Sequence, residues 1–230
     1  MNSEIVLTAD GSHTLYVPEL KEHYHSANGA ITESRHIFIN HGYNAIDRAI
    51  SEVFILEVGF GTGLNALLTW YTALGQGRKI HYIALDPNML QLSTISKLNY
   101  PRFFSEKNAA GIYFKIHDAD CGKEIFIDRH FNIYKMETSL DKVDFNGLKF
   151  HLVYFDAFSP KVQPELWTSD IFRKLFKVML PYAILITYSA KGEVKRTLKR
   201  CGFTINSLPG PIGKREITRA IIPSYLISNS

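Results

Sequence analysis

The sequence is poor in cysteine and in long hydrophobic runs, and both absences exclude classes of protein. Its 230 residues contain two cysteines, Cys121 and Cys201, which lie far apart and outside any C-x-x-C pattern. Neither a disulfide framework nor a zinc site is expected, and the N-terminal histidines lack the cysteine or carboxylate that would complete a ligand set. No apolar run approaches the roughly 18 residues of a membrane-spanning helix, and the N-terminus lacks a secretory signal. We expect a cytoplasmic protein that binds neither a membrane nor a metal.

Internal repeats and low-complexity linkers are also missing, so one main domain is expected. A chain of this length with 46% hydrophobic and 21% charged residues can bury a single sizeable core. We place the main domain at residues 46–230 and a hairpin with a lid segment at residues 1–45. The hairpin strands, 4–7 and 14–17, flank an Asp-Gly turn. Residues 19–43 have two interpretations, a lid over the site or a capped surface helix followed by a strand at 36–39.

Three glycines at alternate positions, Gly59, Gly61 and Gly63, follow an apolar strand and precede an apolar helix pattern. Glycine tolerates a positive φ and has no Cβ, so a ligand fits against the backbone where the next helix presents unpaired N–H groups. The spacing differs from the G-x-G-x-x-G loop of dinucleotide sites. Glu57, at the end of the strand, would repel a pyrophosphate and attract a cationic amino-acid group. This combination indicates S-adenosylmethionine, which carries an ammonium and a sulfonium.

Two further predicted strands also end at an acid. The strand at residues 79–86 ends at Asp86, and the strand at residues 130–137 ends at Glu137. Ligands of an open parallel sheet gather beyond the carboxyl ends of its strands, so Asp86 is placed to accept the ribose hydroxyls of an adenosine. Glu137, or a neighbouring backbone N–H, would flank the adenine. Asp118 and Asp120 compete for the second role, but no clear strand delivers them. A helix cap at Asp86 and an exposed strand end at Glu137 are the structural alternatives.

A second decisive stretch, FHLVYFDAFSP (residues 150–160), begins with a buried strand that ends at Asp156. An acid followed by an aromatic turn with proline, beside the glycine-loop strand, suits an amine acceptor. An alkylamine is mostly protonated at neutral pH, since the reference pKa of lysine is about 10.4. A carboxylate would hold the N–H groups of the amine, direct its lone pair at the methyl carbon and favour loss of the proton. The hypothesis is that Asp156 orients and deprotonates the acceptor; a capping role is the alternative.

The positive charge is concentrated near the C-terminus. Residues 191–219 carry eight basic and two acidic residues, whereas the whole chain has a net charge of +4. This distribution favours a polyanionic partner, although a solvated helix face would look the same. Two last strands, 203–208 and 216–222, follow the basic helix at 191–200. The candidate RNA-binding residues are Lys191, Lys195, Arg196, Lys199, Lys214 and Arg215.

The pattern of elements predicts an α/β, Rossmann-like class I methyltransferase fold. We expect a mostly parallel seven-stranded sheet with an antiparallel C-terminal hairpin and a small N-terminal β-hairpin.

Several blocks of the sequence resemble the methyltransferase domain of the MnmC family. They are EVGFGTGLN (residues 57–65), YFDAFSPKVQPELWTSDIF (154–172), YHSANGAITESRHIF (24–38) and LPGPIGKREITRA (208–220). The resemblance implies methyl transfer from S-adenosylmethionine to the aminomethyl nitrogen of the tRNA wobble uridine. It also implies that the three glycines and Asn65, which closes the first block, hold the cofactor, and that Asp156 occupies the catalytic acid position.

The chain departs from this family in two respects. The bifunctional form has an oxidase domain that these residues do not encode, so we expect a stand-alone methyltransferase and a separate enzyme that makes the aminomethyl uridine. The family commonly has Asp at the position of Glu137. Three other readings stay open: a methyltransferase or aminopropyltransferase for another amine, a non-catalytic RNA-binding module, and a nicotinamide oxidoreductase, which the glycine spacing disfavours.

Overall fold

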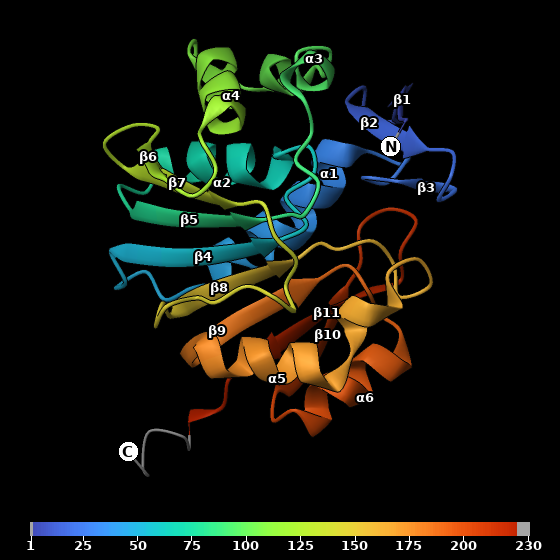
Figure 1. The fold of residues 1–230 in the computed structure, drawn as a ribbon, viewed down its shortest axis with the longest axis vertical. Coiled ribbons are helices and arrows are strands. Elements are labelled where there is room, and N and C mark those ends of the chain that lie inside the picture. Colours follow the sequence, from blue (N-terminus) through green and yellow to red (C-terminus); the bar gives the residue numbers. More distant parts are fainter. Residues whose placement is uncertain (1, 225–230) are drawn as a thin grey trace.

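A mixed eight-stranded sheet runs through the computed structural model, which describes residues 2–224. Its five central strands are parallel, and antiparallel strands complete both edges (Figure 1). In sheet order the strands are β10 (Thr204–Pro209), β11 (Glu216–Ile221), β9 (Met179–Thr187), β8 (Phe150–Phe155), β4 (Glu52–Val58), β5 (Lys79–Leu85), β7 (Phe131–Met136) and β6 (Glu124–Phe126).

Helices cover both faces of this sheet, which explains why its central strands are apolar on both sides. On one face lie α1 (Ala30–Ser34), α2 (Leu64–Leu74), α3 (Leu92–Ile95) and α4 (Ala109–Asp118), and on the other α5 (Ser169–Val178) and α6 (Gly192–Arg200) (Figure 1). Short 3₁₀ turns lie at η2 (Tyr43–Ala45), η3 (Tyr100–Phe103) and η4 (Pro164–Trp167).

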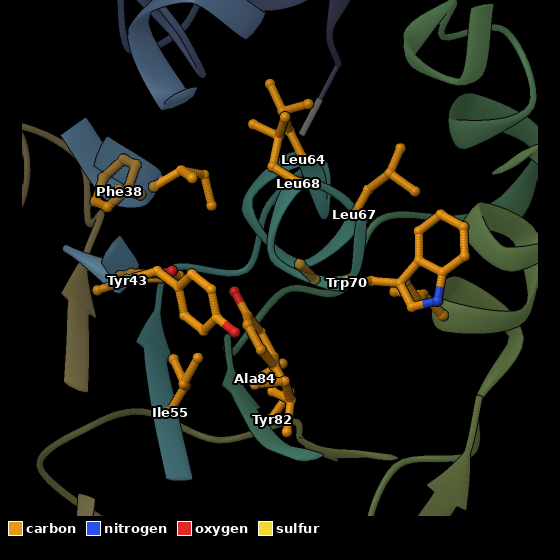
Figure 2. Close-up of a cluster of buried hydrophobic side chains, with 14 of the residues drawn as sticks. Phe38, Tyr43, Ile55, Leu64, Leu67, Leu68, Trp70, Tyr82 and Ala84 are labelled. Atoms are coloured by element: carbon orange, nitrogen blue, oxygen red, sulfur yellow. The ribbon is translucent and has the colours of Figure 1, made fainter. Parts of the chain in front are cut away.

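Successive residues of β4 show how the chain fills two cores. Ile55 packs with the helix α2 side, together with Leu67 and Tyr82, as Figure 2 shows. Leu56, its neighbour, belongs to the core on the α5 side, which also contains Phe155. This alternation is what a strand requires, because successive side chains point to opposite faces.

A small antiparallel sheet of β1 (Glu4–Leu7), β2 (His13–Val17) and β3 (Glu22–His23) lies beyond the ends to which β4 and β5 point (Figure 1). The predicted fold is confirmed, with two additions: β6 makes the main sheet eight-stranded, and β3 extends the hairpin. The strand considered at residues 36–39 was wrong, because Arg35–Asn40 forms a π-helix, η1, that continues α1. Its apolar side chains enter the core, where Phe38 packs edge-on against Tyr154.

None of the helices in residues 2–224 combines the length and the apolar character needed to cross a bilayer.

Candidate active site

The carboxyl ends of β4, β5, β7 and β8 open onto a cavity of about 440 Å³. Its wall contains Gly59 and Gly61 after β4, Asp86 after β5 and Asp156 after β8. Residues 22–27 of the segment that follows β2 form another part of the wall. The volume lies within the roughly 300–1,000 Å³ of small-molecule sites, and the position is the one where open parallel sheets bind ligands.

The glycine loop needs glycine at the positions that the sequence indicated. Gly59, Gly61 and Gly63 have φ values of 87°, 48° and 67°, which disfavour any other residue. A Cβ on Gly59 would lie 2.6 Å from the backbone oxygen of Asp156, and a Cβ on Gly61 would lie 2.9 Å from the Tyr24 ring. Gly63 lies outside the cavity wall, where its missing side chain makes room for the ring of His117.

Asp86 faces the cavity and also fixes the loop beside it. Its Oδ2 accepts a hydrogen bond from the Gly61 N–H at 3.0 Å, and its Oδ1 accepts one from the Asn88 N–H at 2.9 Å. Burial raises the pKa of the Asp86 carboxyl, although these backbone hydrogen bonds oppose the rise. The side chain is therefore held in one orientation toward the space in front of the glycine loop.

Asp156 is linked to a buried pair behind the cavity wall. The Asn65 Nδ2 donates to Asp156 Oδ2 at 2.8 Å and to Glu57 Oε1 at 2.9 Å, and the Tyr82 hydroxyl donates to Glu57 Oε2 at 2.8 Å. Glu57 is fully buried and does not line the cavity, in contrast to the direct ligand contact predicted for it. Asn65 is likewise outside the wall; it supports Asp156 from behind, and Glu57 in turn holds Asn65.

Burial raises the pKa of both carboxyls in this cluster well above their usual range. The hydrogen bonds from Asn65 act against that rise in each case, and the nearby charges of Asp156 and Glu33 add to it for Glu57 and Asp156 respectively. Asp156 is thus a carboxyl with an elevated proton affinity that faces a cavity, a combination typical of functional sites.

The third acidic strand end does not reach the cavity. Glu137 is exposed and absent from the wall, which is formed instead by Thr138 and the residues up to Asp141. Glu137 follows Met136, the last residue of β7, so the strand no longer fixes the direction of its side chain, which turns to solvent, whereas Lys135 within the strand is buried. Asp118 and Asp120 are exposed as well, away from the cavity.

The comparisons with known proteins agree with this geometry. A family model described as S-adenosyl-L-methionine-dependent methyltransferase matches residues 116–223. The tRNA 5-methylaminomethyl-2-thiouridine biosynthesis bifunctional protein MnmC of Cupriavidus metallidurans is 28% identical over 95% of this chain, and that of Magnetococcus marinus is 27% identical over 98%. This chain spans 34% and 35% of those relatives, about a third of their length.

The crystal structure of MnmC2 from Aquifex aeolicus has the same fold, with a TM-score of 0.78 and 24% identity over 95% of this chain and 69% of that one. The chain is therefore similar, over most of its length, to the S-adenosyl-L-methionine-dependent methyltransferase domain of the MnmC proteins.

Residues that sequence reasoning missed hold the glycine loop at Thr62: His25 from the N-terminal segment, and Tyr113 and His117 from α4. His25 Nε2 lies 2.7 Å from Thr62 Oγ1, and the Tyr113 hydroxyl donates to the Thr62 carbonyl at 2.7 Å. Burial lowers the pKa of His25 to about 4 and that of His117, 3.0 Å from the same carbonyl, to about 3. Both imidazoles are therefore neutral at physiological pH and act as structural hydrogen-bonding groups.

The predicted RNA-binding residues separate into three environments. Lys191, Arg196, Lys199 and Arg215 are exposed on or beside α6 and the β10–β11 hairpin. Lys195 is paired with Glu216 at 2.7 Å and donates to Ser207.

Lys214 differs from the other basic residues, because it lines the cavity. Its Nζ lies 2.6 Å from Glu33 Oε1 and 4.4 Å from the centre of the Tyr188 ring. The sequence placed this lysine in the basic stretch GKR, but no local pattern indicated that it pairs with Glu33.

Among the described residues, no group of three or more His, Cys, Asp or Glu side chains is arranged to hold a metal ion.

Proposed function

We propose that this methyltransferase domain transfers a methyl group from S-adenosylmethionine to the aminomethyl nitrogen of the wobble uridine of tRNA. The observation that carries the proposal is the position of Asp156, at the end of β8 and in contact with the glycine loop, with its carboxyl facing the cavity. The names of the MnmC relatives, which refer to 5-methylaminomethyl-2-thiouridine in tRNA, support the choice of acceptor.

The residues around the cavity fit the donor. At Gly59 and Gly61 the backbone itself forms the cavity wall, so a ligand can lie directly against it. Asp86 would offer a fixed carboxylate for the ribose hydroxyls. Residues 138–141, which line the cavity wall, would take the place beside the adenine that was expected for Glu137. When bound, S-adenosylmethionine supplies an electrophilic methyl group on its sulfonium. In this assignment residues 46–230 would be the methyltransferase domain and residues 1–45 its N-terminal hairpin and lid segment, of which residues 22–27 line the cavity.

Asp156 would act on the acceptor amine. Because its pKa is raised, its carboxylate is a better base than an ordinary aspartate and lies closer in proton affinity to the amine. It would accept hydrogen bonds from the amine N–H groups, take one proton or pass it to water, and leave the lone pair directed at the methyl carbon. Asn65 would keep the carboxylate in that orientation through its hydrogen bond to Oδ2.

The exposed basic residues would hold the RNA. Lys191, Arg196 and Lys199 are exposed on or beside α6, and Arg215 is exposed next to Lys214 in the hairpin that reaches the cavity. Contacts with the RNA backbone would position the tRNA, and recognition would come from an unstacked loop base that enters the cavity. The aminomethyl group would be made by a separate activity.

A small free amine is the second candidate acceptor, because the cavity wall is rich in carboxylates such as Glu22 and Glu33. The exposed basic surface favours the RNA over this alternative, since a small amine gains nothing from it.

The test is incubation of the protein with methyl-labelled S-adenosylmethionine and tRNA that carries the aminomethyl uridine, followed by nucleoside analysis. We expect label in the methylaminomethyl nucleoside and none in a parallel reaction with Asp156→Ala. Label in a free polyamine but not in tRNA would select the second candidate, and no label in any acceptor would refute both.

A further inference from the structure

The ion pair between Glu33 and Lys214 stands inside the cavity rather than on the surface. Its two atoms are 2.6 Å apart, and the side chains are only 10% and 34% exposed. Glu33 belongs to α1 and Lys214 to the turn between β10 and β11, so the pair joins two segments that are distant in the sequence. Glu33 is fixed further, because its Oε2 accepts a hydrogen bond from the Ser26 N–H at 2.8 Å.

Lys214 is the one lysine or arginine in the wall of this cavity among the described residues. The groups that interact with its charge come from several elements: Glu33 from α1, Tyr188 after β9, Asp156 after β8, and His25 after β3. The acids that line the same wall are Glu22, Glu33, Asp86, Asp141, Asp156 and Glu165.

Such an acidic wall creates a difficulty for the proposed reaction. Nearby negative charge stabilises the ammonium form of an amine and raises its pKa. An ammonium has no lone pair, so it cannot attack a methyl group. A cavity that attracts the aminomethyl group by charge would therefore also hold it in its unreactive form unless a cation opposes the effect.

We propose that Lys214 is a positioning residue that acts through its charge: by neutralising Glu33 it keeps the acceptor amine in the uncharged form that reacts. The inference rests on the proposed function and deepens it. In the step concerned, the ammonium gives a proton to Asp156 or water, and the nitrogen lone pair forms the N–C bond. The S–C bond breaks with its electron pair left on sulfur.

The test measures single-turnover methyl transfer between pH 6 and pH 9 with an anticodon RNA that carries the aminomethyl uridine. Lys214→Met should move the midpoint of the rate profile to higher pH by roughly one unit, since one unit charge near the amine is worth that much. Glu33→Gln should move it to lower pH. The double variant Glu33→Gln/Lys214→Met removes both charges and should return the midpoint to near the wild-type value.

A direct readout separates the amine from Asp156, whose own pKa also responds to Lys214. The ¹⁵N chemical shift of a labelled aminomethyl group, in complex with the protein and S-adenosylhomocysteine, reports the protonation of that amine. Its titration midpoint should follow the same order: Glu33→Gln lowest, wild type and the double variant between, and Lys214→Met highest.

An equal loss of rate at every pH in all three variants, with unmoved midpoints, would mean that the pair only fastens α1 to the hairpin and would refute the role of Lys214. If Lys214→Met fails to fold, the downward shift expected for Glu33→Gln still decides the question. A wild-type protein that does not methylate this RNA would refute the proposed function, whereas methylation with unshifted variants would refute this inference alone.

Discussion

Replacing Glu57 with Gln should remove a pH dependence of stability that the buried carboxyl imposes. Glu57 is fully buried, and burial raises its pKa well above the usual range. The folded protein therefore keeps a proton that the unfolded chain has already lost near pH 4.3. A group of this kind stabilises the folded state at low pH, and its contribution is lost as the pH rises toward the folded-state pKa.

The size of this pH dependence follows from the one additional proton that the folded protein binds at Glu57. While Glu57 stays protonated in the folded state, each pH unit above about 4.3 lowers the free energy of unfolding by up to about 1.4 kcal/mol, so the wild type should lose stability between pH 5 and pH 7 through Glu57. In a chain of this size, about 1.4 kcal/mol corresponds to roughly 3–6 °C in Tm. Glu57→Gln lacks the titrating proton and should lose less stability over this interval.

The assay is urea unfolding of both proteins at pH 5, 6 and 7, with the difference between them isolating Glu57 from the other titrating groups. Glu19→Gln is the control, because Glu19 is an exposed carboxyl in the loop after β2. Its removal should leave the slope between pH 5 and pH 7 unchanged. Parallel pH slopes for wild type and Glu57→Gln would refute the reasoning.

Three further predictions concern the cavity and the RNA surface. Gly59→Ala should weaken S-adenosylmethionine binding in calorimetry and destabilise the fold by about 1–3 kcal/mol, because its φ is 87° and its Cβ would press on the Asp156 carbonyl; unchanged binding would contradict this. Asp156→Ala should lower kcat by roughly 10²–10⁴ while donor affinity persists; near-normal turnover would exclude its role. Arg196→Glu and Arg215→Glu should weaken tRNA binding and flatten its salt dependence, whereas salt-insensitive wild-type binding would count against an RNA substrate.

The parts of the site that depend on local pattern could be predicted from the sequence. The strand before Gly59, the glycine loop and the helix after it follow from hydrophobic periodicity and from the conformations that glycine permits. Asp86 and Asp156 reach one cavity because parallel strands end at the same edge of a sheet. These residues needed no information about distant contacts.

The remaining parts depend on tertiary geometry. Glu33 and Lys214 meet only because α1 and the β10–β11 turn close on the same cavity, and no local pattern encodes that meeting. Glu57 turns away from the cavity because side chains alternate between the two faces of a strand. The motif alone did not show on which face Glu57 lies. Glu137 lies one residue past the end of β7, whereas the predicted strand included it. An error of one residue in the strand end is enough to place a side chain in solvent and not in the cavity wall.

The central claim is that the cavity at the strand ends binds the donor with its methyl group directed at Asp156. The most direct measurement is a crystal structure of the protein with S-adenosylhomocysteine. The account predicts the ribose at Asp86, the adenine beside residues 138–141 and the sulfur facing the Asp156 carboxyl. A donor bound elsewhere, or a sulfur remote from Asp156, would contradict it.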